Sequence, residues 1–201
     1  MSETEHTGRY LAEVQRIAAS IDPGKIDRIV DLLLKVRDRG GRVFFLGAGG
    51  GAGNASHAVS DFRKIAEIEC YTPSDNSSEL TARINDEGWE TAYANWLRGS
   101  RLNSKDAVFV FSVGGGSAES KISVNLIPSL QLAKDTGAKI VGIVGRDGGY
   151  CAQVGDEVVV LSGISAGAVT ALTEAFQSVL WHCIVSHPKL KVNEMKWESE
   201  K

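Results

Sequence analysis

The chain has 201 residues, of which 43% are hydrophobic and 23% charged, and its net charge is −3. This is the composition of a soluble globular protein, and the length suits one domain with a substantial core. The small negative charge gives no support for a nucleic-acid or membrane-surface partner. Three widely spaced cysteines, a polar N-terminus and the lack of a long apolar run lead us to expect a cytoplasmic protein.

Two helices are predicted before the first strand. Apolar residues recur at helical spacing within residues 7–20. Asp22 and Pro23 are typical of a helix N-cap and first position, and Gly40-Gly41 ends that second helix. We therefore treat residues 1–40 as a helical pair.

Two apolar strands each run into a glycine-rich turn. Strand 42–46 is followed by glycine-rich residues 47–54, and strand 107–112 by Val113-Gly114-Gly115-Gly116-Ser117, which is expected to open a helix over 118–136. Glycine lets backbone approach a ligand, and a helix N-terminus attracts anions. Two such turns on neighbouring parallel strands predict a site for an anionic small molecule, in the first instance a sugar phosphate.

The remaining pattern alternates strands and helices. Further strands are expected at 139–144 and 157–161, a short extended piece at 70–72, and helices at about 53–68, 87–97 and 168–186. Near-continuous apolar strands alternating with helices predict an α/β fold, a three-layer α/β/α sandwich with a parallel sheet of four or five strands. The expected domain is residues 41–187, followed by a polar, solvated tail at 188–201.

His57 and Asp61 stand four residues apart on the helix that the first glycine turn opens. This spacing places the two side chains on one helix face, where they suit a metal ion or a carboxylate that orients an imidazole. A surface pair that merely stabilises the helix gives the same spacing.

His182 lies in the apolar run 179–185, where a satisfied core histidine is the simpler interpretation. Glu174 lies in a similarly apolar setting, which makes an unpaired carboxylate costly. The two are separated by about 12 Å along a helix. One metal ion joins them only if their side chains lean together or come from different subunits.

In combination, these features resemble a known family. Residues 41–187 resemble the sugar isomerase (SIS) domain and, within it, the phosphoheptose isomerases. The motifs that carry the resemblance are Gly47–Gly51, His57 with an acid four residues on, Asn85-Asp86-Glu87-Gly88, Ser112–Ser117, Gly145-Arg146-Asp147-Gly148-Gly149 and the last helix.

The resemblance implies an enzyme that isomerises sedoheptulose 7-phosphate through an enediol, with a divalent metal, usually zinc. It also implies a homotetramer with shared active sites, in which the two N-terminal helices serve oligomerisation. Asp61 matches the family's base and His182 its acid. The implied metal ligands are His57, Asp61, Glu174 and His182. The implied substrate-binding residues are Ala48, Gly49, Gly50, Gly51, Asn85, Asp86, Ser112, Val113, Gly114, Ser117 and Glu174.

The chain departs from the family pattern at its chemistry-bearing positions. Asp61 replaces a glutamate, Glu174 replaces a glutamine, and both glycine loops lack hydroxyls that the family carries. These departures keep a second hypothesis open, a non-catalytic SIS module that binds a sugar phosphate or a protein partner. The retained acids and histidines favour the enzyme.

Overall fold

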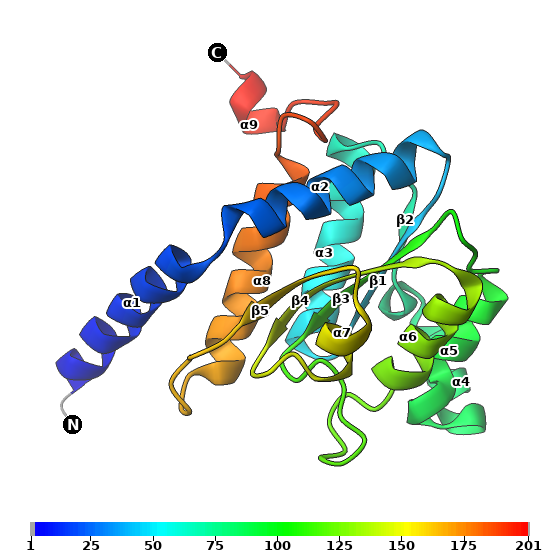
Figure 1. Cartoon of the computed structure of the whole chain (residues 1–201), viewed down its shortest axis with the longest axis horizontal. Coiled ribbons are helices and arrows are strands. Elements are labelled where there is room, and N and C mark those ends of the chain that lie inside the picture. The colour runs from blue at the N-terminus through cyan, green and yellow to red at the C-terminus, as the bar shows by residue number, and fades with distance from the viewer. Residues whose placement is uncertain (1–2, 201) are drawn as a thin grey trace.

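The computed structural model describes residues 3–200, which form one parallel sheet between two helical layers (Figure 1). The sheet has five strands in the order β2-β1-β3-β4-β5, and every neighbouring pair is parallel. The strands are β1 (Val43–Gly47), β2 (Cys70–Tyr71), β3 (Ala107–Ser112), β4 (Lys139–Gly145) and β5 (Glu157–Leu161). The predicted α/β fold with a parallel sheet is confirmed.

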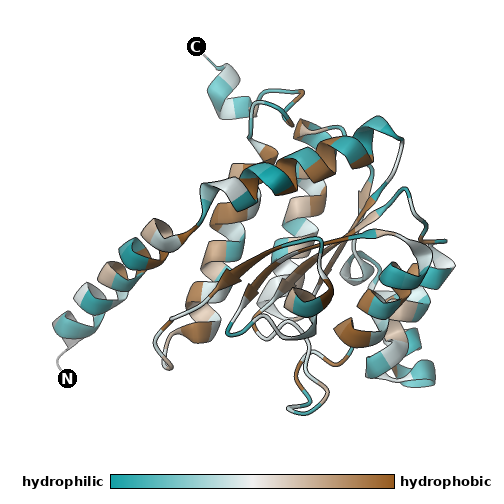
Figure 2. Cartoon of the chain, in the orientation of Figure 1, coloured by the Kyte–Doolittle hydropathy of each residue, from teal (hydrophilic) through white to brown (hydrophobic). Residues whose placement is uncertain are grey.

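Alternate strand residues enter two separate cores, because successive side chains of a strand point to opposite faces. On one face Phe45 and Phe109 stack, and Phe45 meets Phe62 of a covering helix. On the other face Phe44 meets Trp96 edge-on. The sheet is the most continuously apolar part of the fold (Figure 2).

The first core is covered by α2 (Pro23–Asp38), α3 (Gly50–Ile65) and α8 (Val169–Val185). The second is covered by α5 (Trp89–Gly99), α6 (Leu126–Thr136) and α7 (Gly149–Val154). The 3₁₀ turn η1 (Pro73–Asp75) and α4 (Ser77–Glu87) join β2 to α5. None of the described helices combines the length and hydrophobicity that a membrane crossing needs.

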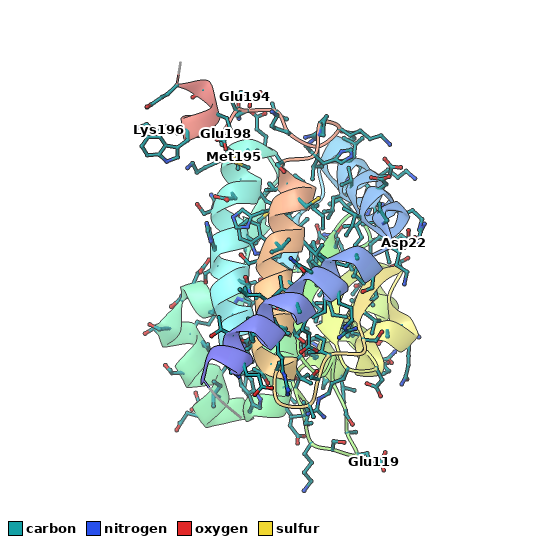
Figure 3. The ribbon with its side chains drawn as sticks, turned by 90° about the vertical axis from the view of Figure 1, so that its left-hand side faces the viewer. Asp22, Glu119, Glu194, Met195, Lys196 and Glu198 are labelled. Carbon is teal, nitrogen blue, oxygen red and sulfur yellow. The ribbon has the colours of Figure 1, made fainter. Side chains whose placement is uncertain are left out.

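The N-terminal helical pair is present as predicted. The side chain of Asp22 accepts a hydrogen bond from the Gly24 amide and so caps α2 (Figure 3). Helix α1 (Glu3–Ser20) extends away from the sheet (Figure 1). It is tied to the β5–α8 loop by Glu13, which accepts from the Ser165 amide at 2.6 Å, and by Arg16, which donates to the Gly163 carbonyl.

The helix expected over 118–136 begins only at Leu126, so that prediction was wrong at its start. Residues 117–122 instead form a short hairpin closed by a bridge between Ser117 and Ile122. A helix from 118 would have placed Pro128 in its interior, where the ring removes a hydrogen bond and clashes with the preceding turn. With the observed start, Pro128 stands in the first turn, which tolerates it.

The C-terminal segment is mostly exposed, as its charges suggested, but its first residues are anchored to the domain. Leu190 is fully buried, and its carbonyl accepts a hydrogen bond from Arg37. The amides of Val192 and Asn193 both donate to the Ile65 carbonyl at the end of α3. A short helix, α9 (Lys196–Ser199), follows.

Candidate functional site

A cavity of about 220 Å³ lies at the carboxyl ends of β1, β3 and β4. The chain leaves β1 toward β2 on one side, and the later strands add on the other side. In open parallel sheets, such a change of direction creates a crevice where ligands bind. The cavity is small compared with drug-binding pockets of roughly 300–1,000 Å³, so it suits a small metabolite.

Six predicted substrate-binding residues line this cavity: Ala48, Gly51, Ser112, Val113, Gly114 and Glu174. The others lie outside its lining. Gly49 caps α3 and is followed by Gly50, while Ser117 lies in the hairpin, where its hydroxyl accepts from the Ser120 amide. Asn85 and Asp86 lie at the exposed end of α4 and hydrogen-bond to each other.

Sequence reasoning missed several polar residues of the same cavity: Ser123, Asn125, Arg146, Thr170 and Gln177. Arg146 stood in a recognised tight turn after a strand, which was a usable signal. Asn125 was hidden by the wrong helix start. Once Pro128 is read as a first-turn residue, Asn125 falls at the N-cap.

The first glycine loop accepts a hydrogen bond from a buried tyrosine and lies against a glutamate carboxylate. The buried Tyr93 hydroxyl donates to the Gly47 carbonyl at 2.6 Å, and burial raises the pKa of Tyr93 to about 12. The Glu174 carboxylate lies against Gly50, so closely that a Cβ at this position would clash with it. The chain's own negative charge therefore faces the start of α3.

The second glycine loop is held in place by hydrogen bonds to α7 and by close packing against the 117–122 hairpin. The Gly115 amide donates to the Ser112 hydroxyl, and the carbonyls of Gly115 and Gly116 accept from the first amides of α7. A Cβ on Gly114 would lie 2.7 Å from a methyl group of Ile122 in the hairpin. The hairpin thus fills the space in which a side chain at position 114 would stand.

Three of the four predicted metal ligands come together on α3 and α8, which lie side by side (Figure 1). Oδ2 of Asp61 is 3.7 Å from Nε2 of His57 and 3.9 Å from Nε2 of His182. One ligand atom from each of the three residues lies within 4.8 Å of the others.

Neighbouring side chains orient the two imidazoles. Nδ1 of His182 lies 2.8 Å from the Ser178 carbonyl, so this nitrogen carries the proton and a neutral ring presents Nε2 as acceptor. Trp181 packs edge-on to His57, and its indole N–H donates to Asn54. The Asn54 amide in turn donates to the Glu174 carbonyl and to Gln177.

The fourth predicted ligand, Glu174, lies apart from this group. Its carboxylate faces Gly50, and it precedes His182 by about 12 Å along α8. Within one subunit the structure therefore brings together His57, Asp61 and His182 but not Glu174.

Two imidazoles and one carboxylate fit zinc or a similar divalent cation. Three protein ligands leave a coordination position for water or substrate, which is the pattern of catalytic sites. The His57 side chain is 58% exposed and that of His182 is 40% exposed, so the group is open to solvent on one side.

The parallel sheet with its loop-lined cavity defines an α/β ligand-binding domain. The chain belongs to the SIS domain family, whose model matches residues 9–145.

Named relatives are similar at modest identity. The lincomycin biosynthesis protein LmbN of Streptomyces lincolnensis is 29% identical over 184 residues, covering 88% of this chain and 66% of that protein. The phosphoheptose isomerase of Helicobacter pylori is 25% identical over 185 residues, covering 89% of this chain and 93% of that enzyme. Phosphoheptose isomerase GmhA of Neisseria gonorrhoeae superposes with a TM-score of 0.78 at 23% identity, covering 92% of this chain and 97% of that one. The resemblance stated from the sequence is confirmed.

Proposed function

We propose that this chain is an aldose–ketose isomerase of a sugar phosphate, with sedoheptulose 7-phosphate as the reference substrate. The phosphoheptose isomerases among its relatives support this activity. The observation that carries it is the Asp61 carboxylate flanked by the Nε2 atoms of His57 and His182. A domain that only binds sugar has no need of this arrangement.

Asp61 acts as the base and His182 as the acid in this proposal. The carboxylate removes the proton from the carbon beside the substrate carbonyl, and the imidazole delivers a proton to the carbonyl oxygen, which gives an enediol. The isomerisation is completed when Asp61 returns a proton to the former carbonyl carbon and the hydroxyl on the neighbouring carbon gives its proton to His182, which leaves that neighbouring carbon as the new carbonyl. Because the Ser178 carbonyl holds the Nδ1 proton, proton transfer to and from His182 takes place at Nε2, the atom that faces Asp61; Nε2 accepts in the neutral ring and donates once it carries a proton.

His57, Asp61 and His182 would hold a divalent metal, with zinc as the proposed ion. When bound, such an ion polarises the substrate carbonyl. We propose Glu174 as a fourth ligand only if its side chain leans along α8 toward His182 or if another subunit supplies it. The ligand roles of Asp61 and His182 compete with their roles as free base and free acid.

The substrate is proposed to lie in the cavity at the ends of β1, β3 and β4, which none of His57, Asp61 and His182 of the same subunit lines, so the base and acid that act on it are proposed to come from another subunit of the shared site. Gly49 and Gly50 contribute backbone at its margin, and Ser117, Asn85 and Asp86 are retained as substrate contacts of the assembled protein. Asn85 and Asp86 are exposed and Ser117 is half-buried, positions that suit contact with a second subunit.

We further propose a homotetramer with shared sites in which α1 and α2 take part. Leu11 on α1 and Val179 on α8 are 57% and 56% exposed. An apolar groove between α1–α2 and α8 includes Val179 and Cys183, the latter adjacent to His182. A second copy seated there lies beside the metal-ligand group. Light scattering of Leu11→Glu and Val179→Glu variants, which we expect to dissociate, tests the assembly.

The activity is tested by proton exchange. The purified protein is incubated with sedoheptulose 7-phosphate in D₂O, and deuterium uptake beside the carbonyl and aldose formation are followed by NMR. We expect Asp61→Asn to lower the exchange rate by at least about a hundredfold. Asp61→Glu, which keeps the carboxylate on a longer arm, should retain it to within about tenfold. Exchange that survives Asp61→Asn contradicts the assignment of the base.

A non-catalytic sugar-phosphate module is the alternative, and one observation favours it. Between Ser112 and Ser117 the second loop consists of Val113 and three glycines, so it offers few hydroxyls to a phosphate, and Ile122 occupies the space beside Gly114. Tight binding of sugar phosphates without any exchange from solvent would support the module and contradict the isomerase.

A further inference from the structure

Asn125 is the most unusual polar residue of the cavity. It is 1% exposed, and neither its amide nitrogen nor its amide oxygen has a hydrogen-bond partner among the described residues. Although it stands at the N-cap of α6, its side chain does not cap the helix. Buried amides are paired in the great majority of cases, so this one calls for a ligand. It lines the cavity.

Arg146 brings the cavity its one positive charge among the described lining residues. Its guanidinium has no hydrogen bond or ion pair within the described part of the chain. Its backbone has φ +54°, a left-handed conformation that an arginine rarely adopts. Ser123, beside Asn125, is also left-handed with φ +48°. Such strain concentrates where a fold must aim a side chain at a ligand.

A serine hydroxyl completes the set of donors. Ser112 accepts from the Gly115 amide, and its oxygen lies 3.2 Å from that of Ser123. One hydroxyl proton of the pair joins the two oxygens, so the other is free to donate into the cavity. A guanidinium, an amide N–H and a hydroxyl suit an anionic group such as a phosphate.

Glu174 makes the end of the cavity opposite Arg146 unfavourable for an anion. It is the one acid among the described cavity-lining residues, and it faces Gly50 beyond β1, whereas Arg146 follows β4. The two strands are two positions apart in the sheet, or about 10 Å. The carboxylate repels an anion from the first glycine loop, and the guanidinium attracts it to the other side.

We propose that Arg146 and Asn125 bind the phosphoryl group of the substrate, in the part of the cavity that Ile122 of the 117–122 hairpin also borders, and that the sugar extends across β3 toward Glu174. This rests on the proposed function and names the phosphate-reading residues of the same site. The hairpin, which carries Glu119 at its far end (Figure 3), places Ile122 against Gly114 and thereby moves the phosphate from the glycine loop to these two side chains.

The test compares matched glycine variants of the full chain. Arg146→Gly removes the guanidinium at a backbone angle that glycine accepts freely. Arg101→Gly is the control, because Arg101 has the same φ of +54° and is not among the residues that line the cavity. The probes for calorimetry are sedoheptulose 7-phosphate, unphosphorylated sedoheptulose and inorganic phosphate.

We expect Arg146→Gly to bind sedoheptulose 7-phosphate about 10- to 100-fold more weakly, the usual effect of losing one charge-assisted hydrogen bond, and to bind sedoheptulose unchanged. Arg101→Gly should change neither affinity. Equal losses for both sugars, or wild-type affinity for the phosphate ester, would overturn the proposal. Inorganic phosphate should lose affinity in parallel with the ester.

Asn125→Leu supplies a second, independent readout. Replacing an unpartnered buried amide with an apolar group of similar size should raise Tm while weakening the phosphate ester about tenfold. A raised Tm with unchanged affinity contradicts the proposal, as does a lowered Tm with unchanged affinity. These binding results do not depend on turnover. If the wild-type protein binds the ester without proton exchange, the proposed isomerase activity is contradicted but the proposed phosphate site is not. If the enzyme is active and Arg146→Gly binds the ester with unaltered affinity, only the proposed phosphate site is contradicted.

Discussion

Nε2 of His182 on α8 lies 3.9 Å from Oδ2 of Asp61 on α3, joining the last long helix of the chain to the helix that follows its first strand. The contact depends on how α3 and α8 pack, and Asn54 and Trp181 hold that packing with a side-chain hydrogen bond. The geometry of the site therefore depends on how α3 and α8 pack against each other.

The metal is predicted to depend on His57. The purified protein should carry about one divalent ion per subunit, and His57→Ala should abolish it because the remaining pair cannot enclose a cation. The fold should survive, since this side chain is 58% exposed. Elemental analysis with circular dichroism measures both. His6→Ala, an exposed histidine on α1, is the control and should keep its metal. Undiminished metal in His57→Ala would show that the ion lies elsewhere.

Asn54 is predicted to position the site without touching the metal. Asn54→Ala removes hydrogen bonds to Gln177 and Trp181. We expect the free energy of unfolding to fall by about 1–3 kcal/mol. Metal affinity should fall by about 10- to 100-fold, as for other residues that orient ligands indirectly. Denaturant titration and competition with a chelator provide the measurements.

Asn95→Ala serves as the matched control for Asn54. The amide of Asn95 donates to Glu87 at the protein surface, so its loss should change stability by no more than about 0.5 kcal/mol. Equal effects of the two variants would mean that Asn54 has no special role in holding α3 against α8.

The sequence identified this pairing of α3 and α8 only in part. The i, i+4 spacing of His57 and Asp61 was enough to place both on one face, because helix periodicity is local information. That His182 joins them depends on helix packing, which no local pattern encodes, and it was reached through resemblance. The sequence did not predict where the Glu174 carboxylate points. Its direction depends on Gly50, because the missing side chain at Gly50 leaves room for the carboxylate.

Local signals also succeeded and failed for definable reasons. Asp22 and Pro23 gave the start of α2 because capping is a property of adjacent residues. The start of α6 was misplaced because the glycine loop was read as leading directly into a helix, although Pro128 argued against it. The burial of Leu190 could not be foreseen, because it results from a return of the chain onto α2 and α3 within a charged stretch.

Tyr93 predicts a dependence of stability on alkaline pH. Burial raises its pKa from 10.0 to about 12, so the folded state disfavours the phenolate. The stabilisation is fully present below pH 10 and is lost as pH rises toward 12, at up to about 1.4 kcal/mol per pH unit. Denaturant titrations of wild type and Tyr93→Phe from about pH 7 to about pH 12 measure this difference.

At neutral pH the Tyr93→Phe variant should be less stable by about 0.5–1.5 kcal/mol, because it lacks the hydrogen bond to the Gly47 carbonyl. Its deficit should shrink above pH 10 and reverse near pH 12, since phenylalanine does not titrate. Other titrating groups are common to both proteins and cancel in the difference. A constant deficit across this range would mean that Tyr93 ionises as easily in the fold as in the unfolded chain.

The second glycine loop is predicted to tolerate no side chain at Gly115. A Cβ there would overlap the Gly148 carbonyl oxygen, and the residue has φ +67°. Gly115→Ala should therefore lower the free energy of unfolding by at least about 2–3 kcal/mol, combining backbone strain with overpacking. Gly53→Ala is the matched comparison. Gly53 lies inside α3, and a Cβ added to it would have open space for 4 Å around, so alanine should stabilise by about 0.5–1 kcal/mol. Denaturant titration measures the free energy of unfolding of both variants. If the loop is held rigidly against α7, Gly115→Ala destabilises the protein and Gly53→Ala stabilises it. A loop that can adjust would instead lose little stability in Gly115→Ala.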